Sequence, residues 1–243
     1  MTSLESKGKA LKSYLSQGEK FSVVQAFQII KQVLFAVKEV HEAGFLHLDI
    51  QDGNVFIKGS LSEEDNLVSL VDFGAARPVC EDGLCPVIRD RALFSTIGFE
   101  SPEIVGHNDG TLRLGAEADL YSVGYLLLLM LTGKRYTQRE LDSANIGLYL
   151  SKRKLKKLNC PAHMADKVHQ IISKALKKTP EERYHSCEEM LADVSDLIHA
   201  LQPYKSDLSQ VVYDAFICYR HGETDSQAAK ILQQKLEHFH IPW

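Results

Sequence analysis

The sequence predicts an α+β protein in which helices supply most of the structure. Several long segments carry apolar residues at helical spacing, with capping residues at their ends. Two short runs rich in β-forming residues, "NVFIK" and "LVSLVDF", flank the polar stretch "GSLSEEDN" and therefore predict a hairpin. The character of the chain changes after Pro203, which places a domain boundary near residues 203–210.

The first long helix is expected to begin at a capping box. Ser22 and Gln25 stand three residues apart, so each side chain can bind the backbone N–H of the other. Gly44 is placed to end the helix, because glycine readily adopts the left-handed conformation that follows a helix. The side chains at helical spacing between these ends are Phe27, Ile30, Leu34, Val37 and His41.

Beyond the hairpin, the sequence predicts an irregular stretch from about Gly74 to Gly115, rich in proline and glycine. Loops of this length are usually functional or disordered. The apolar run "LYSVGYLLLLML" (Leu120–Leu131) is then expected to form a buried helix that ends at Gly133. This run is too short to cross a bilayer, which needs about 20 residues.

Two further amphipathic helices are predicted in the last third of the chain, one around residues 168–176 and one in "SCEEMLADVSDLIHALQ". Between the apolar run and these helices lies the basic segment "SKRKLKKL" (Ser151–Leu158). We interpret this charge run as a solvent-exposed face rather than a patch that binds nucleic acid.

The composition limits the classes of partner that the protein is expected to bind. The chain has 243 residues, 44% of them hydrophobic and 25% charged, with a net charge of −4. This balance gives no general attraction to nucleic acid or to an anionic membrane. The first residues lack an apolar signal core, and the scattered cysteines favour free thiols in a reducing cytosol, although Cys80 and Cys85 could pair or share a metal. We therefore expect a cytoplasmic protein.

The stretch "FLHLDIQDGNVF" carries the residues that indicate a chemistry. Asp49 and Asn54 lie five residues apart in a loop between a helix and a strand, and Asp72 follows the hairpin. If these side chains converge, they form an oxygen-rich pocket of the kind that suits Mg²⁺. Asn54 and Asp72 would hold the cation, which leaves Asp49 free to orient a hydroxyl nucleophile. This division of labour is what phosphoryl transfer requires.

These residues also carry a family resemblance. "HLDIQDGN" resembles the catalytic loop H-R-D-x-x-x-x-N of the protein kinases, and "DFG" resembles their magnesium motif. "STIGFESPE" resembles the end of a kinase activation segment, and "EADLYSVGYLLLLMLTG" resembles the buried helix after it. "TPEERY" is similar to the kinase segment D-P-x-x-R-P. The five landmarks follow one another in the family's order, which makes the signal much stronger than any one of them.

The resemblance implies roles for individual residues at the site. Asp49 would be the base or orienter of the substrate hydroxyl, with Gln51 and Asn54 beside it in the catalytic loop. Asn54 and Asp72 would bind Mg²⁺, and Phe56 would lie under the adenine ring of ATP. ATP and Mg²⁺ are therefore the implied cofactors.

The resemblance also implies structural roles. His47 and Phe73 would stack on each other inside the lobe, and Asp119 would tie the buried helix to the catalytic loop. Glu103 and Arg183 would form a buried ion pair. Thr96 stands where serine/threonine kinases place a threonine near the catalytic Asp, so the resemblance implies a serine or threonine substrate.

Two residues depart from the kinase pattern. Leu48 replaces the Arg before the catalytic Asp, so phosphorylation of the activation segment has no arginine partner there. Gln51 replaces a Lys that neutralises the transferred phosphate, which should slow transfer because a cation near developing negative charge is lost. These departures keep open the alternative of a pseudokinase that serves as a regulatory or interaction module.

The kinase small lobe has no counterpart in the sequence. The residues before 45 contain neither G-x-G-x-x-G nor V-A-x-K, and "LESKGKALKSYLSQGEKFS" resembles the helix that begins the large lobe. We expect residues 1–203 to form a kinase-like C-terminal lobe without the N-terminal lobe. A fragment of a longer protein is the favoured explanation, and a natural half-kinase is the alternative.

The segment after residue 210 resembles a second family. "YDAFICYRHGETDSQAAKILQQKLEHFHIP" is similar to the opening of a TIR (Toll/interleukin-1 receptor) domain, a flavodoxin-like α/β fold. Residues 204–210 would be a linker, and residues 211–243 would supply the first strand and the first helix (Asp225–Phe239) of a truncated domain. The alternative is a strand and helix that pack on the kinase-like lobe.

Together these resemblances imply a serine/threonine protein kinase in a signalling protein fused to TIR. It would transfer the γ-phosphoryl group of ATP to a protein substrate. Its TIR part could associate with the TIR part of another copy, and we expect no nucleic-acid or membrane partner. A third possibility makes the kinase-like part a sensor for a TIR effector that cleaves NAD.

Overall fold

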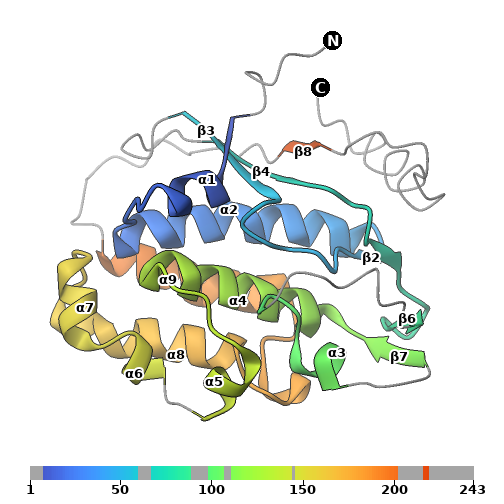
Figure 1. Ribbon diagram of the computed structural model, residues 1–243. Helices are drawn as coiled ribbons and strands as arrows, with labels where there is room; N and C mark the ends of the chain where they lie inside the picture. Colours follow the sequence, from blue (N-terminus) through green and yellow to red (C-terminus); the bar gives the residue numbers. More distant parts are fainter. Residues whose placement is uncertain are drawn as a thin grey trace.

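The computed structural model describes residues 8–59, 67–88, 98–106, 111–143, 146–201 and 216–218. A small sheet and the short helix α1 lie above the long helix α2, and helices α3 to α9 lie below it (Figure 1). The helices are α1 (Leu11–Ser16), α2 (Val23–Glu42), α3 (Pro102–Gly106), α4 (Ala116–Thr132), α5 (Gln138–Ser143), α6 (Ile146–Tyr149), α7 (Lys152–Lys157), α8 (Ala165–Ala175) and α9 (Cys187–Leu201). The strands are β1 (Lys9–Ala10), β2 (Phe45–Leu46), β3 (Val55–Lys58), β4 (Leu67–Val71), β5 (Arg77–Pro78), β6 (Cys85–Ile88), β7 (Thr111–Leu114) and β8 (Phe216–Cys218).

Helix α2 forms as its capping residues predict. The Ser22 hydroxyl accepts a hydrogen bond from the backbone N–H of Gln25 at 3.2 Å, and the Gln25 side-chain oxygen accepts one from the Ser22 N–H at 2.9 Å. The helix ends before Gly44, whose φ is +83°. Its buried face packs against α4, α9 and β4, and this contact is the centre of the core.

The predicted hairpin is present as β3 and β4. The two strands pair antiparallel, with Val55 opposite Leu70 and Phe56 opposite Ser69. Strand β1 lies on the outer side of β3, which gives the order β1-β3-β4-β8. This pairing brings the residue before β3 next to the residues after β4, which is what positions the site described below.

Strand β8 lies at the other edge of this sheet. It runs parallel to β4, with Phe216 opposite Ser69 and Cys218 opposite Val71. The strand expected in "YDAFICYR" is therefore seen at Phe216–Cys218. The helix expected at Asp225–Phe239 and the linker at 204–210 lie outside the described residues.

Helix α4 is buried on all sides, as its continuous apolar run predicts. It ends at Gly133 with φ +66°, where the left-handed backbone suits glycine. Close packing against α8 requires a second glycine, because a Cβ on Gly124 would lie 2.4 Å from the Ala175 Cβ. Within the described ranges, no helix is both long and apolar enough to cross a membrane.

The expectation of an irregular stretch from Gly74 to Gly115 is wrong for much of that stretch. Strand β5 pairs with β2, and β6 pairs with β7, with Cys85 opposite Leu114. Helix α3 lies between these strands in sequence. The pairing joins short segments that are far apart along the chain, so no local alternation reveals it.

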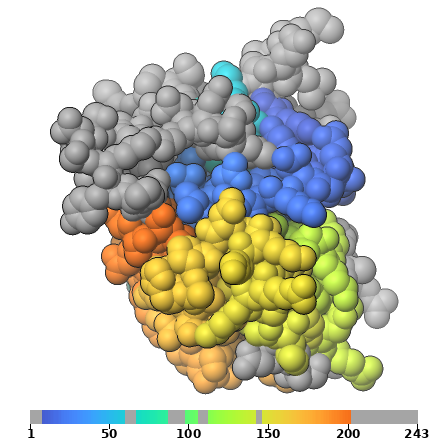
Figure 2. All heavy atoms as spheres, turned by 90° about the vertical axis from the view of Figure 1, so that its left-hand side faces the viewer, coloured from blue at the N-terminus to red at the C-terminus, as the bar shows by residue number. Residues whose placement is uncertain are grey.

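The basic run forms α7 on the outside of the molecule, where it is yellow in Figure 2. Leu155 is buried, whereas Lys152, Arg153, Lys156 and Lys157 are exposed. The interpretation of this run as a solvated face is confirmed.

The expectation of free thiols holds for the cysteines whose side chains are described, which are Cys80, Cys85, Cys160 and Cys187. No group of three or more metal-ligating side chains occurs among the described residues.

Candidate active site

A buried carboxylate on α4 holds the backbone of the loop that follows β2. The Asp119 oxygens accept hydrogen bonds from the backbone N–H groups of His47 and Leu48, each at 2.8 Å. His41 Nε2, from α2, lies 2.8 Å from Asp119 Oδ2. The tie between the buried helix and the catalytic loop is therefore present.

Asp119 is wholly buried, and burial alone would raise its pKa. The hydrogen bond and the charge from His41, together with the N–H of His47, outweigh this effect and lower the pKa of Asp119 below its usual value. The loop thus rests on a carboxylate that its surroundings keep ionised.

Leu48 adopts a left-handed backbone with φ +61°, which is uncommon for a residue other than glycine. Its side chain packs against a small apolar cluster, defined by the buried residues Leu46, Cys85, Ile104, Leu114 and Ala118. The position where kinases carry an arginine is therefore occupied by apolar contacts to β2, β6, α3, β7 and α4.

Two amides hold the carboxylate of Asp49. The Asn54 amide nitrogen donates to Asp49 Oδ2 and to the Asp49 carbonyl oxygen, each at 2.9 Å, and the Gln51 amide donates to Oδ1 at 2.8 Å. Burial raises the pKa of Asp49, the two amides oppose the rise, and the charge of Asp72 adds to it. The result is a fixed carboxylate of increased basicity.

Asp72 lies beside this group because of the hairpin register. The Val71 N–H donates to the Asn54 carbonyl at 2.9 Å, so the residue after Val71 emerges next to Asn54. Asp72 has φ +68°, and its Oδ1 accepts a hydrogen bond from the Gly74 N–H at 3.3 Å. The structure therefore places Asp49, Gln51, Asn54 and Asp72 in one neighbourhood.

His47 and Phe73 stack with ring centroids 4.8 Å apart. Burial lowers the pKa of His47, against the charges of Asp119 and Asp72, which raise it. His47 Nδ1 accepts a hydrogen bond from the Asp49 N–H at 3.3 Å. A neutral His47 is thus part of the support under the loop.

Phe56 stands on β3 between the buried residues Val55 and Ile57. Side chains alternate along a strand, so Phe56 lies on the face opposite the core and is only half-buried. Ser95 and Thr96 fall outside the described residues.

The expected ion pair between Glu103 and Arg183 is confirmed, with the guanidinium bound to both carboxylate oxygens at 2.8 and 2.6 Å. A second pair was not identified from the sequence. Arg135 Nη2 lies 2.8 and 2.7 Å from the two oxygens of Asp52, inside the catalytic loop. No local signal links these residues, because 83 positions separate them.

Comparison with known proteins agrees with this geometry. The family model described as "Protein kinase domain" matches residues 3–194. The probable serine/threonine-protein kinase PknB of Lactococcus lactis is 26% identical over 188 residues, which are 77% of this chain and 28% of that protein. The serine/threonine-protein kinase PLK4 of Drosophila grimshawi is 30% identical over 183 residues, 74% of this chain and 22% of that protein.

The kinase domain of Mycobacterium tuberculosis PknI shares the fold. Its crystal structure matches with a TM-score of 0.54 at 18% identity, covering 79% of this chain and 63% of that one. The chain spans 28% and 22% of the lengths of the two curated relatives above. From residue 3 to residue 194, the chain belongs to the protein kinase family, and its relatives are serine/threonine protein kinases.

Proposed function

We propose that this chain is the large lobe of a serine/threonine protein kinase, which transfers the γ-phosphoryl group of ATP to a hydroxyl of a protein substrate. The observation that carries the proposal is the Asp49 carboxylate, held by the amides of Gln51 and Asn54 beside Asp72. Membership of the kinase family and the serine/threonine kinases among its relatives support the substrate class.

In this proposal, Asp49 orients the acceptor hydroxyl and takes its proton. Its raised pKa suits that role, because a more basic carboxylate accepts a proton more readily. The amides of Gln51 and Asn54 fix the carboxylate, so little reorganisation is needed when the acceptor arrives.

The residues present fit a magnesium ion. Asn54 uses its side-chain nitrogen on Asp49, and within the described part of the chain no hydrogen bond reaches its side-chain oxygen. Asp72 supplies a carboxylate next to it, and Mg²⁺ is commonly held by one or two protein oxygens together with substrate phosphates. When bound, the cation would neutralise phosphate charge. Phe56, on the outer face of β3, would contact the adenine ring.

The test uses the intact protein with ATP and a serine-containing model protein such as casein. Asp49→Asn and Asp72→Ala are each expected to abolish phosphate transfer while the circular dichroism spectrum stays unchanged. Asp166→Asn, an exposed carboxylate on α8, is the matched control and should keep full activity. Transfer that persists in both site variants would contradict the proposal.

A second candidate is a pseudokinase that regulates or binds partners. The observation that favours it is Gln51, whose neutral amide occupies one oxygen of Asp49 where kinases carry a lysine. Nucleotide binding by the intact protein without phosphate transfer would support this candidate. Gln51→Lys discriminates further, since a restored cation should accelerate transfer only in a chain that is already catalytic.

We also propose that residues 211–243 begin a TIR domain, with residues 204–210 as the linker. Both the proposal and its alternative expect the strand at Phe216–Cys218, and the pairing of this strand with β4 is what the alternative expects. Two measurements on the intact protein test the proposal: self-association by light scattering, and consumption of NAD. A monomer that leaves NAD intact would favour the alternative, in which this segment only packs on the kinase lobe.

A further inference from the structure

Arg135 lies in the loop between α4 and α5 and reaches into the catalytic loop. A single nitrogen, Nη2, contacts both oxygens of Asp52 at 2.8 and 2.7 Å. The two ends of this pair differ in environment. The Asp52 side chain is 3% exposed, whereas that of Arg135 is 43% exposed.

Asp52 occupies a sensitive position in the catalytic loop. It stands three residues after Asp49 and two before Asn54, and its carbonyl oxygen accepts a hydrogen bond from the Lys12 N–H at 2.8 Å. A buried carboxylate without a cation is costly, so Asp52 needs its partner to remain in place. The pair therefore sets where the chain turns between Asp49 and Asn54.

Arg135 also contacts a second part of the site. Its guanidinium carbon lies 5.3 Å from the centre of the Phe99 ring, in a range suited to a cation–π contact. Phe99 belongs to "STIGFESPE", the segment that resembles the end of a kinase activation segment. One side chain thus joins the catalytic loop to the segment that precedes α3.

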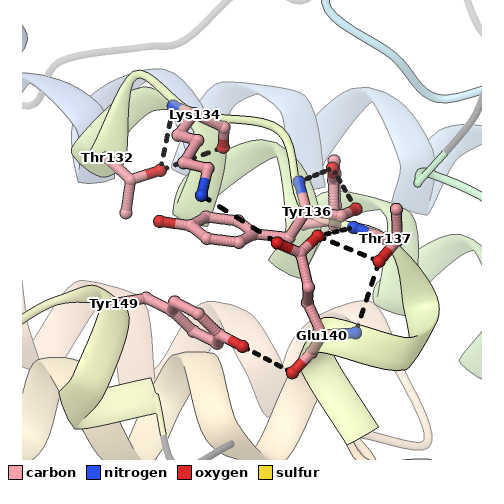
Figure 3. Close-up of polar contacts among 7 residues, drawn as sticks. Thr132, Lys134, Tyr136, Thr137, Glu140 and Tyr149 are labelled. Carbon is pink, nitrogen blue, oxygen red and sulfur yellow. Dashed lines mark hydrogen bonds and ion pairs between the residues drawn. The ribbon is translucent and has the colours of Figure 1, made fainter. Parts of the chain in front are cut away.

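The backbone around Arg135 is held firmly. The Tyr125 hydroxyl accepts from the Tyr136 N–H and donates to the Tyr136 carbonyl, both at 2.8 Å. Thr137 and Glu140 form a capping box at the start of α5, with the Thr137 N–H bound to the carboxylate at 2.7 Å (Figure 3). The guanidinium is therefore presented from a rigid support rather than from a free loop.

We propose that Arg135 is a positioning residue for phosphate transfer, which holds the catalytic loop and the Phe99 segment at a fixed distance from each other. This inference rests on the proposed kinase function. An ordinary surface ion pair would have two exposed partners and a small effect. Here the carboxylate is buried within the catalytic loop, and the arginine comes from a different element.

The test measures steady-state kinetics of the intact protein with casein and ATP. Arg135→Met is expected to lower kcat by about 10–100-fold, because a small displacement of catalytic groups has effects of this size. KM for ATP should change by less than about twofold. Lys134→Met, which removes a neighbouring cation from the same loop, is the control and should keep kcat.

Two further variants separate positioning from simple loss of charge. Arg135→Lys can replace the single nitrogen that contacts Asp52, and it is expected to recover most of the lost kcat. Asp52→Asn should reduce kcat as Arg135→Met does, and the double variant should be no slower than either single one, because both remove the same contact. Unchanged kcat in Arg135→Met, or losses that multiply in the double variant, would overturn the inference.

Hydrogen exchange distinguishes failure of this inference from failure of the proposed function. If the wild-type protein transfers no phosphate, the kinase proposal fails, but the contact can still be tested. Arg135→Met should then accelerate amide exchange at residues 51–54, whereas Lys134→Met should not. Equal exchange in the wild type and Arg135→Met would show that Arg135 does not hold the loop.

Discussion

Two arginine–carboxylate pairs connect distant parts of this chain, and they are built differently. Arg183 is fully buried and uses all three of its nitrogens, on Glu103 and on the carbonyl oxygens of Lys177, Glu117 and Lys178. Arg135 is half-exposed and uses one nitrogen on Asp52. The first pair is part of the core, while the second lies where the core meets the catalytic loop.

The comparison shows that one arginine–carboxylate pair can stabilise the fold, while another fixes the position of a loop. The donors on Arg183 that the structure describes are directed at both oxygens of one carboxylate and at three backbone carbonyl groups. The Arg135 side chain is 43% exposed, so its removal disturbs the core less. We therefore expect removal of Arg183 to destabilise the lobe strongly and removal of Arg135 mainly to displace the loop.

The largest expected effect compares the two arginines directly. Arg183→Met should lower the free energy of unfolding by about 3–5 kcal/mol, because it leaves the partly buried Glu103 carboxylate without its cation and removes the bonds to three backbone carbonyl groups. Arg135→Met should lower it by a smaller amount, about 1–2 kcal/mol, because it leaves the Asp52 carboxylate without its cation but lets water reach that carboxylate from the exposed side of the pair. Urea denaturation of both variants measures this, with Arg153→Met on the exposed face of α7 as the control. Equal losses would remove the distinction between the pairs.

A smaller effect should follow when the support of Arg135 is loosened and Arg183 is left intact. Tyr125→Phe removes the hydroxyl that binds both backbone groups of Tyr136, at a cost of about 1–2 kcal/mol in the free energy of unfolding. The contact between the rings of Phe99 and residue 125 would remain. The control is Tyr14→Phe, because the Tyr14 hydroxyl has no hydrogen bond among the described residues. This variant should leave the free energy of unfolding unchanged. A neutral Tyr125→Phe would show that the loop needs no such support.

The smallest expected effect depends on pH. Arginine keeps its proton throughout the accessible range, so pH dependence between 7 and 6 must come from other groups, above all histidines. Burial lowers the pKa of His47, so the native protein keeps it neutral while the unfolded chain binds a proton below about pH 6.5. Stability should therefore fall as the pH decreases through that value, by less than about 1 kcal/mol between pH 7 and pH 6.

The pH effect is measured as a difference between two denaturation series. His47→Phe keeps a ring against Phe73 but cannot bind a proton, so its stability should depend less on pH than that of the wild type. Parallel curves for the two proteins would mean that His47 is protonated equally in the folded and unfolded states.

Local sequence signals predicted the parts of the fold that short stretches determine. The capping box of Ser22 and Gln25 gave the start of α2, and the alternating runs gave the hairpin β3–β4. The resemblance to kinases supplied the pair Glu103–Arg183, although the two residues are 80 positions apart. Periodicity and capping residues predict single helices and strands. A family resemblance can also predict contacts between residues that are far apart in the sequence.

The missed features all depend on contacts between distant segments. Strands β6 and β7 are short and pair across a long interval, and Asp52 and Arg135 meet only because α4 brings its following loop under the catalytic loop. The left-handed backbone of Leu48 opposes the preference of leucine, so tertiary contacts must impose it. No single stretch of sequence contains this information.

The packing of Leu48 has a consequence for how the catalytic loop responds to its surroundings. Its link to β6, α3 and β7 is made of apolar contacts alone. Added salt does not screen such contacts, but they weaken on cooling because the hydrophobic effect does. The connection between the catalytic loop and these strands should therefore depend little on ionic strength and should respond to temperature.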